Sequence, residues 1–407
     1  MSKRIVAVFT GNRAEYGLQL PILRAIEAHP DLDYRLIVSG AHLDPNFGRT
    51  RAEIEADGFV IHAEVKIDLA EDTLDATAQA IGSGVSSMGR ALVDIRPDIL
   101  VVYADRFEGF AAVIAGTQMN VPTAHVEGGD VTEGGALDDS VRHAMTKLAH
   151  LHFTTNQQAT NRVLAMGEEH WRVHTAGFPA IDLIEDGNFS SVAEVREKLG
   201  IDVTRPIVLF TQHSVTTEFD QADAQIKPSL EAIEDLCGND DVQAIVTYPN
   251  NDAGGRRIIA ELGAFAGKKL KNVQLRSSLG RKLYHGVLAL ARDPSVRVVC
   301  AGNSSSGIKE TPAFGCPTVN IGSRQLGRLR AENVIDTGYG AAEIRSAIKR
   351  GLFDESFRAA CRTAINPYGL GDAGRKIADV LARVPLDAAL LRKGMTLKGE
   401  TRDGWYR

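Results

Sequence analysis

The sequence lacks the cysteine pattern of a metal cluster or a disulfide scaffold. Four cysteines occur in 407 residues, and no two of them form a Cys-X-X-Cys motif. Cys300 lies inside an apolar run, where a free cysteine behaves as a small hydrophobic core residue. The cysteines therefore predict neither a bound metal nor a framework of cross-links.

Long apolar runs are missing as well. No stretch approaches the roughly 20 apolar residues that a membrane-spanning helix needs. The N-terminal stretch MSKRIVAVFTGNR holds only about seven apolar residues before a turn, which is too short for a signal peptide. We therefore predict a cytoplasmic protein without a membrane partner.

Positive charge is not in excess either. Lys and Arg number 46 against 52 Asp and Glu, which gives a formal net charge of -6. Proteins that bind nucleic acid present a basic face to the phosphate backbone, so we expect no nucleic-acid partner. The Gly-X-Gly-X-X-Gly fingerprint of a dinucleotide site is also absent after the first apolar run. Composition alone still permits a non-catalytic binding protein.

Short apolar runs alternate with amphipathic stretches along the chain. Each run is almost continuously apolar, which is typical of parallel strands covered on both faces. The predicted strands are 4–10, 34–40, 98–104, 122–128, 206–212, 242–249, 296–302 and 317–322. A further strand is predicted around Leu151, which His150 and His152 flank. Strand–helix alternation of this kind predicts an α/β fold with doubly wound parallel sheets.

The chain is too long for one typical hydrophobic core. The strand–helix series restarts after a polar, turn-rich segment at 184–192. We therefore predict two Rossmann-like domains, residues 1–186 and 187–370, followed by a further helix that begins near residue 371. In such sheets ligands bind beyond the carboxyl ends of the strands, so we expect a cleft between the two domains.

The densest group of acidic residues lies in HVEGGDVTEGGALDDSVRH, at 125–143. Its carboxylates lack the spacing of a calcium loop, so general acid–base work and simple cation binding both stay open. Asp105 ends another predicted strand, where it is either a helix cap or a catalytic group. The candidate residues of the acidic segment are Glu127, Asp130, Glu133, Asp138, Asp139, Arg142 and His143.

The segment GNSSSGIKE, at 302–310, follows a predicted strand and opens a predicted helix. Bare backbone N–H groups and hydroxyls at such a turn bind anions. Glu310 lies one helical turn beyond Ser306, where a carboxylate accepts hydrogen bonds from the hydroxyls of a ribose. With Arg324 to balance charge, this pattern predicts a nucleoside diphosphate site.

Other strand ends carry weaker signals. Arg13, in FTGNRAEYG, is either a phosphate ligand at a helix start or a surface residue. His213 follows an apolar strand and is either structural or a group that contacts phosphate. The loops at 248–255 and 277–291 are either parts of a nucleoside pocket or ordinary turns.

Several of these motifs together resemble one known family. TGNRAEYG, HVEGGD, DDSVRHAMTKLAHLHF, TQHSVT, GNSSSGIKE and NPYG are similar to motifs of the hydrolysing UDP-N-acetylglucosamine 2-epimerases of sialic-acid biosynthesis. The resemblance covers roughly residues 4–380 and extends, more distantly, to the non-hydrolysing 2-epimerases. It implies a GT-B architecture with the nucleotide on the C-terminal domain, and a C-terminal helix at 371–390 that packs back on the first domain.

The resemblance also implies a reaction. Such an enzyme eliminates UDP from C1 with loss of the C2 proton, and water then adds to the 2-acetamidoglucal to leave N-acetylmannosamine. No metal or redox cofactor is implied, and a homodimer or homotetramer is expected. The implied catalytic residues are Asp105, Glu127, Asp130, Asp138 and His213.

The remaining site residues follow from the same resemblance. The groups expected to bind the nucleotide and its diphosphate are Arg13, Asn250, Ser278, Ser304, Ser305, Ser306, Gly307, Glu310 and Arg324. The groups expected to contact the rest of the substrate are Arg142, His143 and Gln325.

One position departs from the family pattern. Close relatives read Gly-Gly-Glu where this chain has Gly-Gly-Asp at Asp130, which is one methylene shorter. That difference implies either that Glu127 bears more of the work or that the sugar sits differently. The second option suggests a modified sugar, such as the UDP-2,4-diacetamido-2,4,6-trideoxyglucose of legionaminic-acid pathways. A non-hydrolysing epimerase, a GT-B glycosyltransferase and a nucleotide-sugar sensor remain alternatives. The sequence leaves open UDP or GDP, and which carboxylate is base and which is acid.

Overall fold

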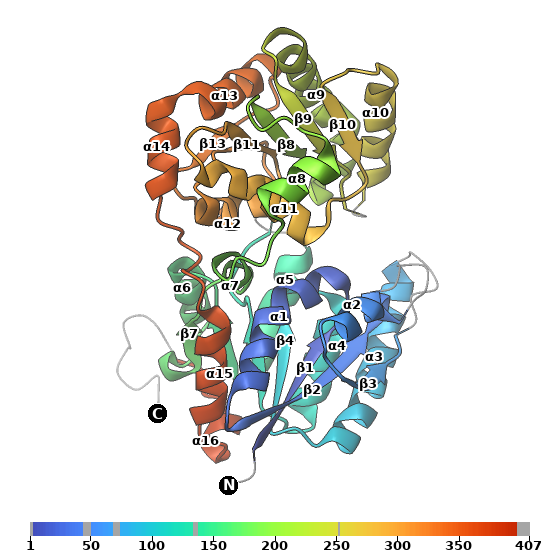
Figure 1. Cartoon of the computed structure of the whole chain (residues 1–407). Coiled ribbons are helices and arrows are strands. Elements are labelled where there is room, and N and C mark those ends of the chain that lie inside the picture. Colours follow the sequence, from blue (N-terminus) through green and yellow to red (C-terminus); the bar gives the residue numbers. More distant parts are fainter. Residues whose placement is uncertain (1–2, 44–49, 68–73, 133–136, 251–252, 397–407) are drawn as a thin grey trace, which may run out of the picture. The chain divides into compact units, whose positions relative to one another are not determined.

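The computed structural model describes residues 3–43, 50–67, 74–132, 137–250 and 253–396, and the chain divides into two compact units (Figure 1). Unit 1 contains Met1–Asp130, Leu137–Asp182 and Gly371–Arg407. Unit 2 contains Val131–Ala136 and Leu183–Leu370. The chain therefore leaves unit 1 and returns to it at its C-terminal end.

The described part of unit 1 is built on one parallel sheet of seven strands, in the order β3-β2-β1-β4-β5-β6-β7. The strands are β1 (Arg4–Thr10), β2 (Leu32–Ser39), β3 (Ile61–Val65), β4 (Ile99–Tyr103), β5 (Thr123–Val126), β6 (Leu151–Thr154) and β7 (Val173–Thr175). The helices are α1 (Arg13–Ala28), α2 (Thr50–Ala56), α3 (Leu74–Ile95), α4 (Phe107–Gln118), α5 (Leu137–Leu148), α6 (Gln157–Ala165), α15 (Ala373–Arg383) and α16 (Ala388–Leu391), with α7 (Ala180–Glu185) at the unit boundary.

Unit 2 holds a second parallel sheet, in the order β10-β9-β8-β11-β12-β13. Its strands are β8 (Ile207–Thr211), β9 (Gln243–Thr247), β10 (Val273–Arg276), β11 (Val298–Gly302), β12 (Thr318–Ile321) and β13 (Val334–Thr337). Its helices are α8 (Val192–Leu199), α9 (Ala222–Asn239), α10 (Gly255–Gly267), α11 (Gly280–Ala289), α12 (Ser306–Lys309), α13 (Ala341–Phe353) and α14 (Glu355–Thr363).

Strand order reverses once in each sheet, between β1 and β4 and between β8 and β11. In doubly wound sheets the carboxyl ends of strands at such a switch point form the ligand site. Strands β1, β4, β8 and β11 are buried over most or all of their length, because helices cover both faces. The predicted α/β class with two doubly wound parallel sheets is confirmed.

The strands that sequence reasoning missed are the four edge strands, β3, β7, β10 and β13. An edge strand is partly exposed, and its residues alternate or mix in polarity. In β3 the exposure alternates along IHAEV, and β10 is not fully buried at any residue. A search for continuously apolar runs therefore finds central strands and passes over edges.

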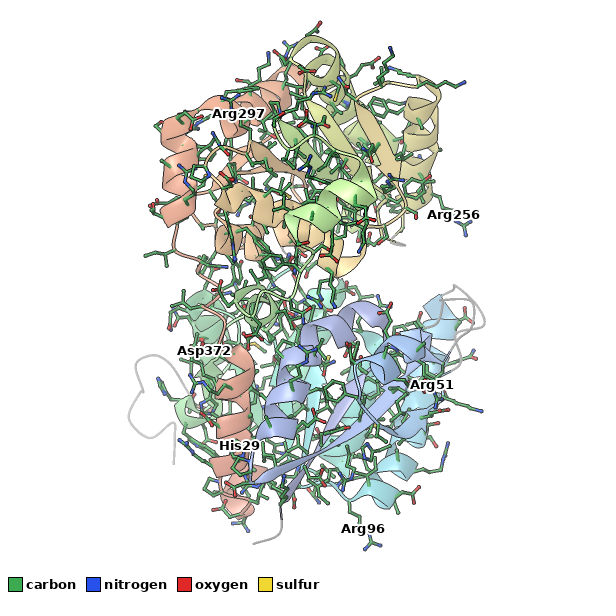
Figure 2. All side chains as sticks on the ribbon, viewed as in Figure 1. His29, Arg51, Arg96, Arg256, Arg297 and Asp372 are labelled. Carbon is green, nitrogen blue, oxygen red and sulfur yellow. The ribbon has the colours of Figure 1, made fainter. Side chains whose placement is uncertain are left out.

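Helix α15 packs against α1 within unit 1. Asp182 accepts hydrogen bonds from the backbone N–H groups of Ala373 (3.1 Å) and Gly374 (2.7 Å), which satisfies the N-terminus of this helix. His29, at the end of α1, lies 3.8 Å from Asp379 of α15, and Figure 2 shows His29 beside the helix. No helix in the described ranges is long and apolar enough to cross a membrane.

Within unit 1 the buried carboxylate of Glu168 contacts the segment that follows α16. The side chain of Glu168 is fully buried and contacts Lys147 Nζ (2.5 Å), Lys393 Nζ (2.8 Å) and His152 Nε2 (2.9 Å). Lys393 also donates to the carbonyl of Ala149 (2.7 Å) and to two carbonyls at the end of α5. Lys393 thus caps the C-terminus of α5, the helix whose first turn carries Asp138 and Asp139.

Candidate active site

In unit 1 the acidic residues gather around one buried arginine on α5. Arg142, 3% exposed, forms an ion pair with Asp105 at the end of β4, and its Nη1 lies 3.4 Å from Asp139 Oδ1. Burial disfavours the charged form, but the carboxylates of Asp105, Glu127, Asp130 and Asp139 raise the pKa of Arg142. The arginine therefore stays charged, with Asp105 and Asp139 in direct contact and Glu127 and Asp130 close enough to affect its ionisation.

Glu127 follows β5 in a strained conformation. Its φ is 68°, a region that residues with a side chain rarely adopt, and its backbone N–H donates to the carbonyl of Phe153 (2.8 Å). Tyr103, at the end of β4, is also buried. Burial and the nearby Glu127 and Asp130 raise the pKa of Tyr103, so its phenol stays protonated beside these carboxylates.

Asp130 is 5% exposed and accepts hydrogen bonds from two side chains beyond β6. The Thr155 hydroxyl donates from 2.7 Å, and the Asn156 amide from 3.3 Å. Sequence reasoning missed both residues. They follow a strand directly, so the rule that flagged Asp105 and Glu127 applies to them as well.

The other predicted residues of unit 1 differ in exposure, and some are not described by the structure. Asp138 and Asp139 occupy the first turn of α5, where Asp138 is exposed and Asp139 is buried. His143 is half-buried, which lowers its pKa. Arg13 begins α1 as predicted, but its side chain lies outside the described part of the chain, as does Glu133 altogether.

The turn before Arg13 is held by a buried acid that the sequence did not flag. Glu15 accepts from the backbone N–H of Gly11 (3.0 Å), while Asn12 caps α1 by accepting from the backbone N–H of Glu15 (3.0 Å). Burial raises the pKa of Glu15 to about 8. This carboxyl group supports the turn and is largely protonated at neutral pH.

In unit 2 the predicted residues converge at the switch point. His213, after β8, donates its backbone N–H to Asn303 Oδ1 (2.6 Å), and Asn303 follows β11. The Asn303 carbonyl accepts from Gln325 (2.8 Å) and Arg324 (3.2 Å), which follow β12. Asn250, after β9, donates its backbone N–H to His213 Nδ1 (3.0 Å). Four parallel strands thus direct polar groups to one edge of the sheet.

This switch point requires a glycine. Gly302 has φ 122°, and a Cβ at this position would lie 1.9 Å from the carbonyl oxygen of Thr211. Any larger residue would push β11 away from β8. The close approach of the two strand ends lets Asn303 reach His213.

His213 is a neutral imidazole at physiological pH. Burial and the charge of Arg324 lower the pKa of His213 to about 3. A neutral imidazole carries one ring proton, and Nδ1 lies 3.0 Å from both the backbone nitrogen and the side-chain Oδ1 of Asn250. His213 can therefore donate one hydrogen bond, but it does not add positive charge.

The serine segment is part of a second network of unit 2. Ser304, Ser305 and Ser306 are partly exposed at the start of α12, and Ser306 Oγ lies 3.3 Å from the hydroxyl of Tyr284. His285 Nε2 contacts Glu310 Oε2 at 2.9 Å. Burial alone raises the pKa of Glu310, but the contact with His285 lowers it below its usual value. Glu310 therefore remains an ionised acceptor.

The other predicted residues of unit 2 differ in exposure. Ser278 is exposed and its hydroxyl accepts from the backbone N–H of Gly280 (3.1 Å). Gly307 is buried within α12. Gln325 is 1% exposed, and its Oε1 accepts from Arg328 Nη1 (2.6 Å). The contacts of Gln325 are thus those of a side chain that shapes the loop.

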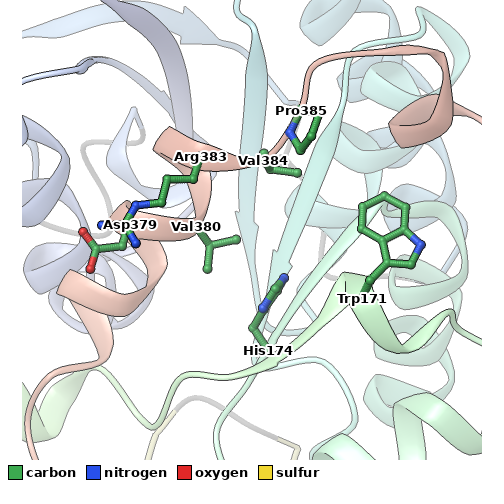
Figure 3. A pocket seen from close by; sticks show the side chains of 7 residues that line it. All are labelled: Trp171, His174, Asp379, Val380, Arg383, Val384 and Pro385. Carbon is green, nitrogen blue, oxygen red and sulfur yellow. The ribbon is translucent and has the colours of Figure 1, made fainter.

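A hollow of about 280 Å³ lies elsewhere in unit 1, between β7 and α15 (Figure 3). Its lining residues are Trp171, His174, Asp379, Val380, Arg383, Val384 and Pro385. None of the predicted site residues lines it. The acidic cluster and the serine segment therefore lie outside this hollow.

Comparison with known proteins identifies the family. A family model described as UDP-N-acetylglucosamine 2-epimerase matches residues 24–382. The chain belongs to this family. The family predicted from the sequence motifs is therefore confirmed.

Three relatives illustrate the range of names in this family. GDP/UDP-N,N'-diacetylbacillosamine 2-epimerase (hydrolyzing) of Campylobacter jejuni is 34% identical, over 83% of this chain and 85% of the relative. UDP-N,N'-diacetylbacillosamine 2-epimerase (hydrolyzing) of Legionella pneumophila is 32% identical, over 97% and 99%. UDP-N-acetylglucosamine 2-epimerase of Neisseria meningitidis is 32% identical, over 88% and 89%.

Solved structures of this family share the fold. The 2-epimerase from Neisseria meningitidis bound to UDP-GlcNAc superposes with a TM-score of 0.77 at 18% identity, covering 94% of this chain and 100% of that one. The Methanocaldococcus jannaschii enzyme in complex with UDP-GlcNAc and UDP gives a TM-score of 0.72 at 18% identity, over 93% and 99%. The predicted GT-B type of fold is thereby confirmed.

Proposed function

We propose that this protein is a hydrolysing 2-epimerase, which converts a nucleotide-linked 2-acetamido sugar to the free 2-epimer and a nucleoside diphosphate. The observation that carries the proposal is the group of carboxylates, Asp105, Glu127, Asp130 and Asp139, around the buried Arg142. Inversion at C2 needs a base for an unactivated C–H proton and an acid for the returning proton. Several carboxyl groups in different environments supply both roles.

The reaction balances without an external oxidant or reductant. In the first step a carboxylate takes the C2 proton, the bond between C1 and the diphosphate oxygen breaks, and a C1=C2 double bond forms. In the second step water adds its hydroxyl to C1 while a proton is delivered to the opposite face of C2. Unit 1 supplies the proton-transferring groups, with Glu127 as the base and Asp105, Asp130 and Asp138 as the other members of the set.

The nucleotide part of the substrate is assigned to unit 2. The hydroxyls and backbone N–H groups of Ser304, Ser305 and Ser306 donate to the diphosphate at the helix start. Arg324 supplies positive charge, and neutral His213 donates one hydrogen bond as the diphosphate leaves. Glu310 accepts the ribose hydroxyls.

The sugar of this substrate follows from relatives and from Asp130. Both relatives whose names contain "hydrolyzing" are named for N,N'-diacetylbacillosamine, a 2,4-diacetamido-2,4,6-trideoxy sugar. The shorter side chain of Asp130 suits a sugar that sits differently from N-acetylglucosamine. We therefore propose the 2,4-diacetamido sugar, carried on UDP or GDP, as the preferred substrate. The predicted cytoplasmic location and homo-oligomeric state stay predictions.

Proton and phosphorus NMR in D₂O tests the proposal. The purified protein is incubated separately with UDP-N-acetylglucosamine and with the UDP- and GDP-linked 2,4-diacetamido-2,4,6-trideoxy sugars. The expected products are free nucleoside diphosphate and a 2-epimer deuterated at C2, formed fastest from a 2,4-diacetamido sugar. A nucleotide-linked epimer without free diphosphate would identify a non-hydrolysing enzyme, and absence of turnover on all three sugars would contradict the proposal.

Substitution Glu310→Gln tests the ribose assignment. The amide keeps the size of the side chain but loses the charge that His285 contacts at 2.9 Å. Since hydrogen bonds to a charged group are worth about 1.5–3 kcal/mol, we expect affinity for UDP and UMP to fall about 10- to 100-fold. Calorimetric titration measures this loss, with Glu343→Gln of α13 as the control. Equal affinity for UMP in the variant and the wild-type protein would rule out the ribose contact.

A further inference from the structure

The end of β6 carries a pair of side chains whose hydrogen bonds have a defined direction. Asn156 caps α6, because its Oδ1 accepts the backbone N–H of Ala159 at 2.9 Å. That bond orients the amide, so Nδ2 points to Thr155 Oγ1 (2.9 Å) and to Asp130 Oδ1 (3.3 Å). The donors of this pair are therefore aimed at the loop that follows β5.

The direction of the Thr155 hydroxyl follows from the same bond. Its oxygen accepts from Asn156 Nδ2, so its own proton is left to donate to Asp130 Oδ1 at 2.7 Å. Asp130 Oδ1 thus accepts two donors, and the three residues are only 1% to 5% exposed. These two donors fix the direction of the Asp130 carboxylate.

The backbone of the loop is held by the same helix. Arg162 of α6 donates to the carbonyl of Gly129. Gly129 has φ 79°, and a Cβ there would lie 2.4 Å from the carbonyl oxygen of Ala159. The loop that carries Asp130 is thus held through its backbone by α6, and the Asp130 side chain by the two residues that precede α6.

We propose that Thr155 and Asn156 are positioning residues, which aim Asp130 at the reacting sugar. The inference rests on the proposed 2-epimerase function and adds a support for one of its acids. Asp130 lies close enough to Arg142 and Tyr103 to affect their ionisation, so it belongs to the acidic cluster. The Asp130 side chain is short, so its position depends on its surroundings, and the hydrogen bonds from Thr155 and Asn156 hold the carboxylate in one orientation.

Substitution Thr155→Val tests this role. Valine matches the shape of threonine but cannot donate, so Asp130 loses the shorter of its two bonds. Because misplacement of a catalytic group by about 1 Å costs on the order of 100-fold, we expect kcat to fall about 10- to 100-fold, with KM within about threefold. Thr155→Ser keeps the hydroxyl and is expected to restore most of kcat.

A matched control separates positioning from stability. Thr160 lies on α6 and is also buried, and its hydroxyl contacts those of Thr154 (2.5 Å) and Thr175 (2.6 Å). Thr160→Val is expected to lower the thermal midpoint without lowering kcat. In an Asp130→Asn background, Thr155→Val is expected to add no further loss, because its effect passes through Asp130.

The outcomes distinguish the two proposals. If the wild-type protein is active but Thr155→Val keeps kcat, or loses it equally with Thr160→Val, the positioning role is wrong and the epimerase function stands. Additive losses in the Asp130→Asn background would overturn the positioning role as well. If the wild-type protein turns over none of the three nucleotide sugars, the epimerase function fails, and the inference falls with it.

Discussion

Replacing Glu127 with Gln is expected to lower kcat for release of nucleoside diphosphate by about 10²- to 10⁴-fold, the usual contribution of a general base. Glutamine keeps the length of the side chain but cannot accept a proton. Glu127 follows β5 with φ 68°, a backbone geometry that sets its direction independently of side-chain identity. Affinity for UDP is expected to stay within about threefold, since the proposed nucleotide-binding groups are residues of unit 2.

Steady-state kinetics and deuterium incorporation at C2 measure this effect together. Loss of both diphosphate release and C2 exchange places Glu127 at proton abstraction. Asp94→Asn, on the exposed face of α3, serves as the control for a lost carboxylate elsewhere in unit 1. If Glu127→Gln retains activity within threefold of the wild-type protein, the base is another member of the cluster, and Asp105 is the next to replace.

Glu168→Gln is expected to give the largest loss of stability. The fully buried carboxylate contacts Lys147, Lys393 and His152, and removing one partner of a buried ion pair costs about 3–5 kcal/mol. Chemical denaturation at pH 7 measures the change in the free energy of unfolding. Glu169→Gln is the matched control, because Glu169 is partly exposed and its partner Arg172 (2.6 Å) also donates to backbone carbonyls, which it keeps in the variant. This loss is expected to cost about 1 kcal/mol or less.

The loss at Glu168 should depend on pH in a defined direction. Burial alone raises the pKa of Glu168, but hydrogen bonds from His152, Lys147 and Lys393 lower it to about 2, from 4.5 in an unfolded chain. A group with a depressed folded pKa stabilises fully above its unfolded value and loses that contribution as pH falls toward the folded value. The wild-type and Glu168→Gln proteins are therefore expected to differ most above about pH 4.5 and to converge toward pH 2. A difference that grows as pH falls would contradict this account.

Apolar runs and strand-end residues were enough to predict much of the fold and part of the site. Central strands such as β1, β4, β8 and β11 are buried on both faces, so almost all of their consecutive residues are apolar. The residues after them then follow from the rule on strand ends. The edge strands were not predicted, because they are only partly buried and their sequences are therefore not continuously apolar.

The site residues that were missed share one property. Thr155, Asn156 and His285 are common residue types in ordinary local sequence, and their importance arises from partners distant in the chain. Thr155 lies 25 residues from Asp130, and His285 lies 25 residues from Glu310. The strand-end rule applies to Thr155 and Asn156, but no local pattern predicts which distant residues they contact.

By itself the sequence determined the α/β class, the two strand–helix series and the family, because burial on both faces and strand-end motifs are local properties. Tertiary structure alone decided that Asp105 is a partner of Arg142, since strand order brings Asp105 to α5 from 37 residues away. It also decided that His213 is neutral, because burial and the neighbouring Arg324 set its ionisation. Charge state and direction of hydrogen bonds depend on desolvation and on neighbours in space, which exist only once the chain has folded.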